Sequence, residues 1–370
     1  MQDITWLIVL SFLFFFLIYL TWEQIYLKII RKSFKYVIHV NGTRGKSTVC
    51  RLIDSILREK GYLTFTKTTG TLPIIIHCDG KTSEVKRLGK ANIREQIRMM
   101  KQAYCEKAEV LILECMAVEP SLQWHSEAHI IRSDINVITN ARHDHLTEMG
   151  FSLDEIISSL AKTIPYHKVV ICGDLINQEK WLQKAQEKNS EIIFIPEIDN
   201  KDLLSSLEVN FLIASKTCEY IKIDEDTIKK GVKKYLPDPG AFQIIQINDF
   251  KFINCFSVND PDSTKAIYRD LMTIYKHDDF VFLVNNRGDR PIRTLQNIAL
   301  INELKPKKLI ITGDNIKFVK RKIDKIVTTT IYHHFDDLLK EKIIFAFGNI
   351  ANNGFKILNE CKKRSENNEC

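Results

Sequence analysis

The chain has 370 residues, of which 45% are apolar and 27% are charged, and its formal net charge is +7. This length predicts two domains. The mild positive charge, without an arginine-rich or aromatic-interleaved tract, argues against nucleic acid as a partner. Nine cysteines are scattered without a Cys-x-x-Cys pair or a Cys/His zinc spacing. That pattern predicts reduced thiols in the cytosol and argues against a disulfide framework.

The N-terminal segment is the most apolar stretch of the chain. Ile4–Trp22 carries no charge, and a helix of that length spans about 28 Å, close to the hydrocarbon thickness of a bilayer. Asp3 precedes the segment and four bases follow it by residue 35, so the positive-inside rule places the remaining chain in the cytoplasm. A signal peptide would need a basic start and a small-residue cleavage site, which are missing. A buried core helix is the other alternative. We expect residues 1–35 to form a single-pass membrane anchor.

A phosphate-binding loop is predicted directly after this anchor. Tyr36–Val40 reads as a buried strand, Gly42-Thr43-Arg44-Gly45-Lys46-Ser47-Thr48 follows, and Val49–Leu57 repeats apolar residues at helical spacing. Glycines let backbone N–H groups converge on an anion, and the helix N-terminus adds its positive dipole end. Lys46 would neutralise phosphate charge and Ser47 would ligate Mg²⁺. The alternative is a chance Gly-Lys-Ser turn, since Val40 stands where the full pattern has its first glycine.

Further polar side chains follow other predicted strands. Gly61–Lys67 leads into the hydroxyl-rich loop Thr68–Thr71, where Thr69 and Thr71 are candidates for substrate contact, and Val110–Glu114 ends on a carboxylate. Ligands collect at the carboxyl ends of strands in open α/β sheets, so Glu114 is a candidate to meet a nucleotide-bound metal. The alternatives are an ordinary turn and a glutamate that faces solvent. A strand at Ile135–Asn140 delivers His143 and His145, which are weak as a zinc motif.

The rest of the chain alternates strands and helices, which predicts a doubly wound parallel sheet. Residues 78–92 are polar and read as an irregular surface excursion, and 210–214 is a short apolar run. Residues 236–240 form a Pro/Gly linker, so we expect a phosphate-loop α/β domain over 36–236 and a smaller α/β domain over 237–370. Helices are predicted at 93–107, 151–164, 175–188 and 225–235, and strands at 168–172, 191–195, 242–247, 252–256, 280–285, 308–312 and 342–347.

Arg287, Arg290 and Arg293 follow the strand predicted at 280–285. Guanidinium groups bind phosphate or carboxylate in a bidentate manner, so Arg287 and Arg290 are candidates for substrate binding. The alternative is a solvated loop held by salt bridges.

The order of several short motifs resembles the ATP-dependent subunit of poly-gamma-glutamate synthase, also called the capsule biosynthesis ligase. That family is a membrane-attached branch of the Mur ligase and folylpolyglutamate synthase group. The resemblance covers nearly the whole chain and depends on these motifs: Asn41–Thr48, Lys67–Thr71, Glu114–Ala117, Asp144-His145, Met149-Gly150, Thr163–Tyr166, Pro237–Ala241 and Gly348–Ile350. The chain departs from the family pattern at Thr147 and at Gln243.

The resemblance implies an ATP site and its metal ligands. Gly42, Gly45, Lys46, Ser47 and Thr48 become the phosphate loop, with Thr43 and Arg44 inside it. Ser47, Glu114 and His145 become ligands to Mg²⁺, with Mn²⁺ as an alternative ion, and Lys46, Glu114 and His145 become the catalytic groups. Asp260 is placed near the nucleotide, and Lys162 lies in the region of the carbamylated lysine of Mur ligases.

The implied reaction is amide ligation. A γ-carboxylate of glutamate would attack the γ-phosphate of ATP, and the amine of the next glutamate would then displace phosphate from the acyl phosphate. The partners would be glutamate, the growing poly-gamma-glutamate chain, the membrane and small integral-membrane subunits, and a homo-oligomer is left open. The alternative function is a membrane-tethered ATPase that drives or regulates polymer export without forming a bond.

Overall fold

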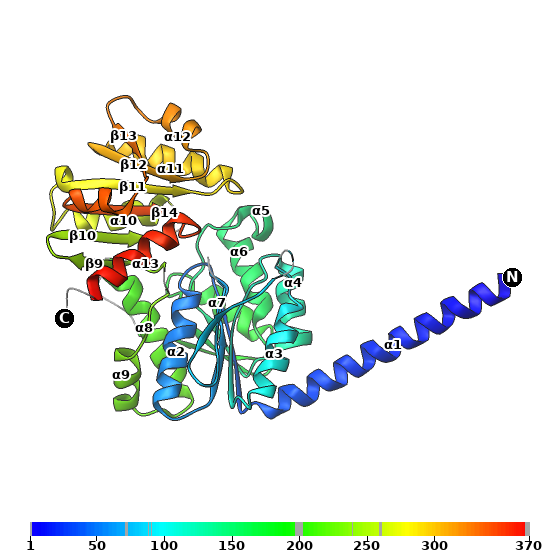
Figure 1. Ribbon diagram of the computed structural model, residues 1–370. Coiled ribbons are helices and arrows are strands. Elements are labelled where there is room, and N and C mark those ends of the chain that lie inside the picture. Colours follow the sequence, from blue (N-terminus) through cyan, green and yellow to red (C-terminus); the bar gives the residue numbers. More distant parts are fainter. Residues whose placement is uncertain are drawn as a thin grey trace. The chain divides into compact units, whose positions relative to one another are not determined.

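The computed structural model describes residues 2–70, 73–87, 89, 91–196, 203–238, 240–258 and 261–366. The chain divides into two compact units (Figure 1). Unit 1 comprises Met1–Asn200 with Ser205–Leu236, and unit 2 comprises Lys201–Leu204 with Pro237–Cys370. Thr71 and Asp260, both predicted site residues, lie outside the described residues.

A single long helix, α1 (Gln2–Ser33), opens unit 1 and projects away from it (Figure 1). An 18-residue window within its segment Trp6–Ser33 has a mean hydropathy of 2.0, and among the described residues α1 is the one helix long and apolar enough to cross a bilayer. Its first half exposes large apolar side chains such as Phe12 and Phe15, whereas Leu27 and Ile30 in its second half are buried. The apolar span thus continues without a break into a helix that packs on unit 1.

Unit 1 is built on an eight-stranded sheet with the order β4-β3-β2-β5-β1-β6-β7-β8. The pairs from β2 through β8 are parallel, and β3 and β4 are added in antiparallel fashion at one edge. The strands of the parallel part are almost continuously buried, as expected for a sheet covered by helices. The strands are β1 (Tyr36–Asn41), β2 (Thr64–Lys67), β3 (Ile74–Ile76), β4 (Thr82–Glu84), β5 (Val110–Glu114), β6 (Ile135–Ile138), β7 (Val169–Cys172) and β8 (Glu191–Phe194).

The helices of unit 1 bury apolar faces in three hydrophobic clusters against this sheet. Helix α6 begins with a capping box between Ser152 and Glu155, so its first N–H groups have acceptors. Besides α1, the helical elements are α2 (Lys46–Glu59), α3 (Glu95–Cys105), α4 (Pro120–His125), the π-helix η1 (Ser126–Ile131), α5 (Leu146–Met149), α6 (Leu153–Leu160), the 3₁₀ turn η2 (Ala161–Thr163), α7 (Gln178–Gln186), α8 (Leu203–Tyr220) and α9 (Glu225–Lys233).

Unit 2 is a second α/β layer structure with a six-stranded sheet of order β13-β12-β11-β14-β10-β9. Its strands are parallel except β9, which pairs antiparallel with β10, and its own two clusters form its core. The strands are β9 (Gln243–Ile247), β10 (Phe250–Cys255), β11 (Phe280–Asn286), β12 (Lys308–Gly313), β13 (Thr328–Ile331) and β14 (Ile343–Gly348). The helical elements are α10 (Pro261–Leu271), η3 (His277–Asp279), α11 (Pro291–Leu304), α12 (Ile316–Lys322), η4 (Phe335–Lys340) and α13 (Asn353–Glu366).

The expected alternation of strands and helices is present, and the differences concern short or polar segments. Residues 78–92 were expected to be irregular, but they contain strand β4 at the edge of the sheet. Strands β3 and β13 were not predicted: β3 has only three residues, and Thr328–Ile331 is polar and mostly exposed. The apolar run 210–214 lies inside helix α8, where neighbouring residues supply the helical period.

Candidate functional site

The phosphate loop connects the end of β1 to the start of α2. Gly42 has a φ of +129° and Gly45 a φ of +82°, conformations that side chains rarely adopt. A Cβ at Gly45 would lie 2.3 Å from the side-chain oxygen of Asn210, so a larger residue would have to displace Asn210 in addition to adopting a left-handed backbone. No side chain caps the N-terminus of α2, and its first turn holds no acidic residue. The first N–H groups of this 14-residue helix are therefore available to an anion.

Asn140 and Thr139 hold this loop in shape from the neighbouring strand end. The Asn140 side-chain oxygen accepts hydrogen bonds from the Thr43 hydroxyl (2.7 Å) and from the Arg44 N–H (3.1 Å). The Thr139 hydroxyl donates to the Arg44 carbonyl at 2.6 Å. Sequence reasoning assigned no role to these two residues. The sequence feature that could have identified them is their position directly after β6, which pairs in parallel with β1.

Lys46 is the first residue of α2. Its ammonium donates to the Gly42 carbonyl at 2.6 Å and to the Thr43 carbonyl at 3.4 Å. Among the described residues, no carboxylate forms an ion pair with Lys46. Its positive charge is therefore held beside the loop by neutral acceptors, which phosphate oxygens can replace.

Ser47 and Glu114 meet directly. The Ser47 hydroxyl donates to the Glu114 carboxylate at 2.7 Å, and the same oxygen accepts the Thr69 N–H at 2.6 Å. Glu114 is 3% exposed, because β5 pairs with β1 in a register that places Glu114 beside Val40. A hydroxyl and a carboxylate oxygen are donors that Mg²⁺ prefers, so these two residues fit a magnesium ion.

His145 lies on the turn before α5, with a φ of +51°. Burial lowers the pKa of His145, and the nearby Lys46 charge acts in the same direction, although Asp144 opposes it. A neutral imidazole can bind a metal. Among the described residues, however, no hydrogen bond joins His145 to Ser47 or Glu114, and no three His, Cys, Asp or Glu side chains there form a metal-binding group. Arg44 approaches Asp144 at 3.4 Å, which connects this turn to the phosphate loop.

Lys67 is a functional candidate that sequence reasoning quoted only as part of a motif. Its side chain is fully buried, its ammonium lies 2.8 Å from Glu95, and Glu95 also pairs with Arg87 at 2.6 Å. Burial lowers the pKa of Lys67. Burial alone would raise the pKa of Glu95, but hydrogen bonds from Arg87 and Lys67 lower it to about 2. This network is adjacent to the strand end that carries Thr69.

Two of the predicted substrate residues lie in unit 2, between the end of β11 and the start of α11. Arg287 pairs with Asp289 through contacts of 2.9 and 2.7 Å. Arg290 is exposed and precedes Pro291, the first residue of α11. In unit 1, the exposed Lys162 lines a cavity of about 180 Å³ with Trp124 and Tyr166, a cavity that no phosphate-loop residue lines.

Comparison with known protein families gives two matches that together cover most of the chain. Residues 40–244 match the Mur ligase middle domain, and residues 242–364 match the poly-gamma-glutamate synthase CapB C-terminal domain. The first match contains the phosphate loop and Glu114, and the second covers nearly all of unit 2.

Individual relatives agree with this assignment. The chain is 33% identical to PGA synthase CapB of Bacillus subtilis (strain 168), over 85% of this chain and 86% of the relative. It is 32% identical to the capsule biosynthesis protein CapB of Bacillus anthracis, over 91% of this chain and 78% of the relative. A bifunctional folylpolyglutamate synthase/dihydrofolate synthase solved with Mn, AMPPNP and L-glutamate has the same fold, with a TM-score of 0.65 at 13% identity, covering 91% of this chain and 92% of that one. The chain therefore belongs to the poly-gamma-glutamate synthase CapB family of ATP-dependent amide ligases.

Proposed function

We propose that this ligase activates a γ-carboxylate of glutamate at the loop of residues 42–48 and uses Ser47, Glu114 and His145 to hold the metal. As a member of the CapB family, the chain is an ATP-dependent enzyme of poly-gamma-glutamate synthesis. The observation that carries the residue assignment is the contact between Ser47 and Glu114, 2.7 Å apart beside the uncapped N-terminus of α2.

The chemistry proceeds in two substitutions. A carboxylate oxygen of glutamate attacks the γ-phosphorus of ATP, the bond to the bridging oxygen breaks, and ADP leaves. The amine of the incoming glutamate then attacks the acyl carbon, and phosphate leaves with the carboxylate oxygen while the amine loses a proton. Neither step needs a side-chain nucleophile, so the protein contributes through positioning and charge stabilisation.

The phosphate loop and the metal ligands contribute to this reaction in different ways. The N–H groups at the start of α2 bind phosphate oxygens, and Thr43 and Arg44 keep the loop in the shape that Asn140 supports. Lys46 exchanges its two carbonyl acceptors for phosphate oxygens and neutralises charge there. Bound Mg²⁺ or Mn²⁺ would supply further positive charge between the two anions. Ser47 and Glu114 offer the oxygen donors, and the neutral His145 would complete the set from the turn before α5.

The substrate contacts are proposed from residue chemistry. Thr69 and Thr71 carry hydroxyl groups suited to a polar substrate, and the Thr69 N–H already binds Glu114. Arg287 and Arg290 are suited to glutamate carboxylates, and Asp260 is proposed to contact the nucleotide. The folylpolyglutamate synthase that shares this fold was solved with an ATP analogue, Mn and L-glutamate, which supports the same combination of ligands here.

The location proposed for the enzyme is the cell membrane, with both units on the cytoplasmic side. Helix α1 supports this assignment by its length and composition, and the bases after the apolar span support the orientation. A polymer that must leave the cell explains an anchor, and small integral-membrane subunits are the proposed partners for polymerisation or export.

Transfer of oxygen isotope tests the reaction. Membranes containing the full chain receive ATP, Mg²⁺ and glutamate or its oligomer labelled with ¹⁸O in the γ-carboxylate. Activation as an acyl phosphate moves one ¹⁸O into the released phosphate for each amide bond. Lys46→Ala should reduce labelled phosphate and polymer by at least about 100-fold, because one lost charge-stabilising group costs about 3 kcal/mol in such sites.

The matched control is Lys60→Ala at the other end of α2, where Lys60 pairs with Asp224 in an exposed contact. This variant should keep wild-type activity. ATP hydrolysis that is indifferent to glutamate and releases unlabelled phosphate would contradict the proposal and favour the export ATPase.

A further inference from the structure

The anchor helix is attached to unit 1 by an ion pair at the point where its uncharged span ends. Glu23 follows Trp22 directly and is only 4% exposed. Both of its carboxylate oxygens accept hydrogen bonds from Arg94, at 2.9 and 3.0 Å, and Lys101 lies 4.0 Å away. Arg94 precedes α3 and Lys101 lies within it. Burying a carboxylate without a partner costs free energy, so the pair with Arg94 fixes α3 against the anchor helix.

The part of α1 that follows Glu23 also packs against unit 1. Leu27, Ile30 and Phe34 are buried in a cluster with apolar residues of α3 and β1. Arg31 donates to the Asp134 carboxylate at 2.6 Å and to the Arg132 carbonyl at 2.8 Å. The second half of the helix is thus part of the packed unit, which excludes a flexible tether between anchor and enzyme.

This attachment determines how close unit 1 lies to the bilayer. A helix rises 1.5 Å per residue, so Glu23 lies only about 1.5 Å beyond the span that ends at Trp22. The polar head-group layer extends roughly 5–8 Å beyond the hydrocarbon on each side. Arg94 and Lys101 therefore lie at the depth of the lipid head groups, and α3 lies there with them.

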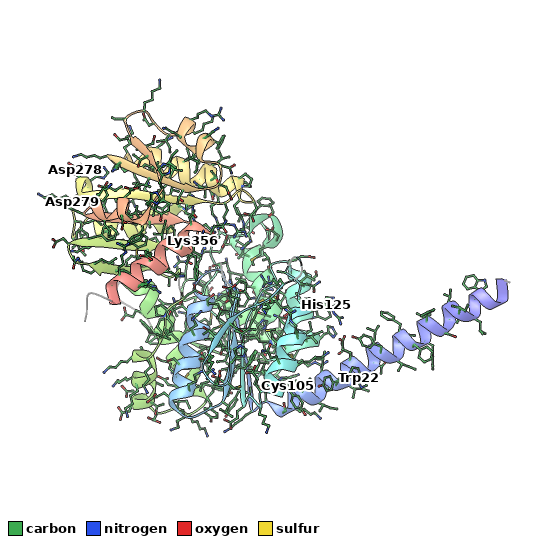
Figure 2. All side chains as sticks on the ribbon, viewed as in Figure 1. Trp22, Cys105, His125, Asp278, Asp279 and Lys356 are labelled. Carbon is green, nitrogen blue, oxygen red and sulfur yellow. The ribbon has the colours of Figure 1, made fainter. Side chains whose placement is uncertain are left out.

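The exposed side chains near this point form what we call the α3–α4 flank: Lys86, Arg98, Tyr104 and Trp124. Arg98 donates to the Lys86 carbonyl at 3.1 Å, and the buried Ser126 of η1 donates to Gln96 of α3 at 2.5 Å, so the segment before α3 and the helix after Trp124 are both fixed to α3. Among the described residues, neither Lys86 nor Arg98 forms an ion pair. Figure 2 shows Trp22 and His125, the neighbour of Trp124, on the side from which α1 projects.

Unpaired bases beside exposed aromatic rings are the composition of a surface that binds lipid head groups. Tyr104 is 40% exposed and Trp124 is 37% exposed. Aromatic rings of this kind prefer the membrane–water interface, and bases near an anionic leaflet are attracted to its phosphates. Lys28 and Lys32 on α1 are exposed as well and lie within reach of the same layer.

We propose that the α3–α4 flank docks on the anionic lipid head groups of the cytoplasmic leaflet, so that the membrane holds unit 1 at a defined height and orientation. The proposal rests on the membrane anchor of the proposed function. It assigns the flank to phospholipid and not to a protein subunit, because Lys86 and Arg98 are exposed cations that match the charge of anionic phosphates.

Tryptophan quenching by head-group nitroxide lipid tests the contact in the full chain. The chain has four tryptophans, and Trp124 and Trp22 are isolated by difference from Trp124→Phe and Trp22→Phe. In vesicles of phosphatidylcholine with phosphatidylglycerol, both residues should be quenched. The double variant Lys86→Glu/Arg98→Glu should weaken the flank contact about 30-fold, since each base near an anionic surface contributes roughly fivefold, while Trp22 stays quenched.

The matched control is Lys230→Glu/Lys233→Glu on α9, which makes the same charge change on exposed residues of another helix of unit 1. It should leave Trp124 quenched, and unquenched emission from the fully buried Trp181 reports that each variant is folded.

Four outcomes would overturn the docking. Trp22 quenched without Trp124 shows that the anchor inserts and the flank faces water. Equal quenching of Trp124 in pure phosphatidylcholine shows that head-group charge is not recognised, and shielding of Trp124 only in native membranes assigns the flank to a membrane protein. Absence of quenching at Trp22 rejects the anchor itself, and with it this proposal, while ¹⁸O transfer by the full chain decides the ligase reaction separately.

Discussion

His39 shows how a buried ionisable side chain beside the phosphate loop can matter for stability. It lies in β1, is completely buried, and its Nδ1 is 2.7 Å from the equally buried Glu127. Both the Ser133 N–H and hydroxyl donate to the other oxygen of Glu127. Burial alone would lower the pKa of His39, but Cys115 and Glu127 raise it to about 9. His39 is therefore protonated at neutral pH, and its contact with Glu127 ties the π-helix η1 to the central strand.

Because the folded pKa of His39 exceeds its ordinary value of 6.5, the stability it contributes is fully present below pH 6.5 and is lost as pH rises towards 9. We expect the free energy of unfolding of the wild type to fall over this window. His39→Gln should cost about 3 kcal/mol at pH 6.5, the typical cost of breaking a buried pair, and should show a flatter profile up to pH 9. Denaturant titrations at several pH values measure this.

The control replaces an exposed histidine of unit 2, His333→Gln. It should keep the wild-type dependence on pH. A His39→Gln profile parallel to that of the wild type would show that the pair does not titrate in this window.

At the scale of elements, the N-terminus of α2 depends on one residue that has no side chain. Gly45 is the N-cap of α2 in a left-handed conformation, and Asn210 of α8 lies against the position where a Cβ would be. Gly61, two residues beyond the C-terminal end of α2, has a similar φ of +96°, yet nothing lies within 4 Å of its Cβ position. Substitutions at these two glycines therefore distinguish the effect of backbone strain alone from that of strain combined with a steric clash.

Gly61→Ala should destabilise the protein by about 1 kcal/mol, since a left-handed residue with a side chain costs roughly that much. Gly45→Ala should cost more and should also abolish nucleotide binding, because its Cβ would lie 2.3 Å from Asn210 and displace the loop. Urea denaturation and binding of a fluorescent ATP analogue measure both effects. Nucleotide binding retained in Gly45→Ala would contradict the role assigned to the loop backbone.

At the scale of the whole molecule, each unit has its own hydrophobic cores. The clusters centred on β1, β5 and β6 belong to unit 1, and those centred on β10, β11 and β14 belong to unit 2. All four tryptophans, Trp6, Trp22, Trp124 and Trp181, lie in unit 1. Tryptophan fluorescence therefore reports on unit 1 alone.

We expect two unfolding transitions by calorimetry, of which only one changes tryptophan emission. A non-hydrolysable ATP analogue with Mg²⁺ at about 100 times its Kd should stabilise the fluorescent transition by roughly 2.7 kcal/mol. Lys46→Ala should lose this shift while keeping both transitions, and Lys60→Ala should keep the shift. A single transition seen by both methods would contradict independent cores, and an unchanged shift in Lys46→Ala would contradict nucleotide binding at the loop.

The sequence pattern was sufficient to predict the features that depend only on residues close together in the chain. The apolar span, the strand, glycine loop and helix around Gly42–Ser47, and most buried strands of both sheets follow from side-chain period and turn chemistry over a few residues. Strands β3, β4 and β13 were missed, since β3 has only three residues and β4 and β13 are polar edge strands that are defined by their pairing partners and not by their composition.

Contacts between distant residues were decided only by the tertiary structure. Ser47 and Glu114 meet because β5 pairs beside β1, Thr43 meets Asn140 because β6 lies on the other side, and Glu23 meets Arg94 because α3 packs on α1. Strand order and helix packing follow from burying apolar faces across the whole unit, a long-range property that no local window contains. The sequence by itself therefore determined which chemical groups this ligase carries, and the fold decided which of them act together.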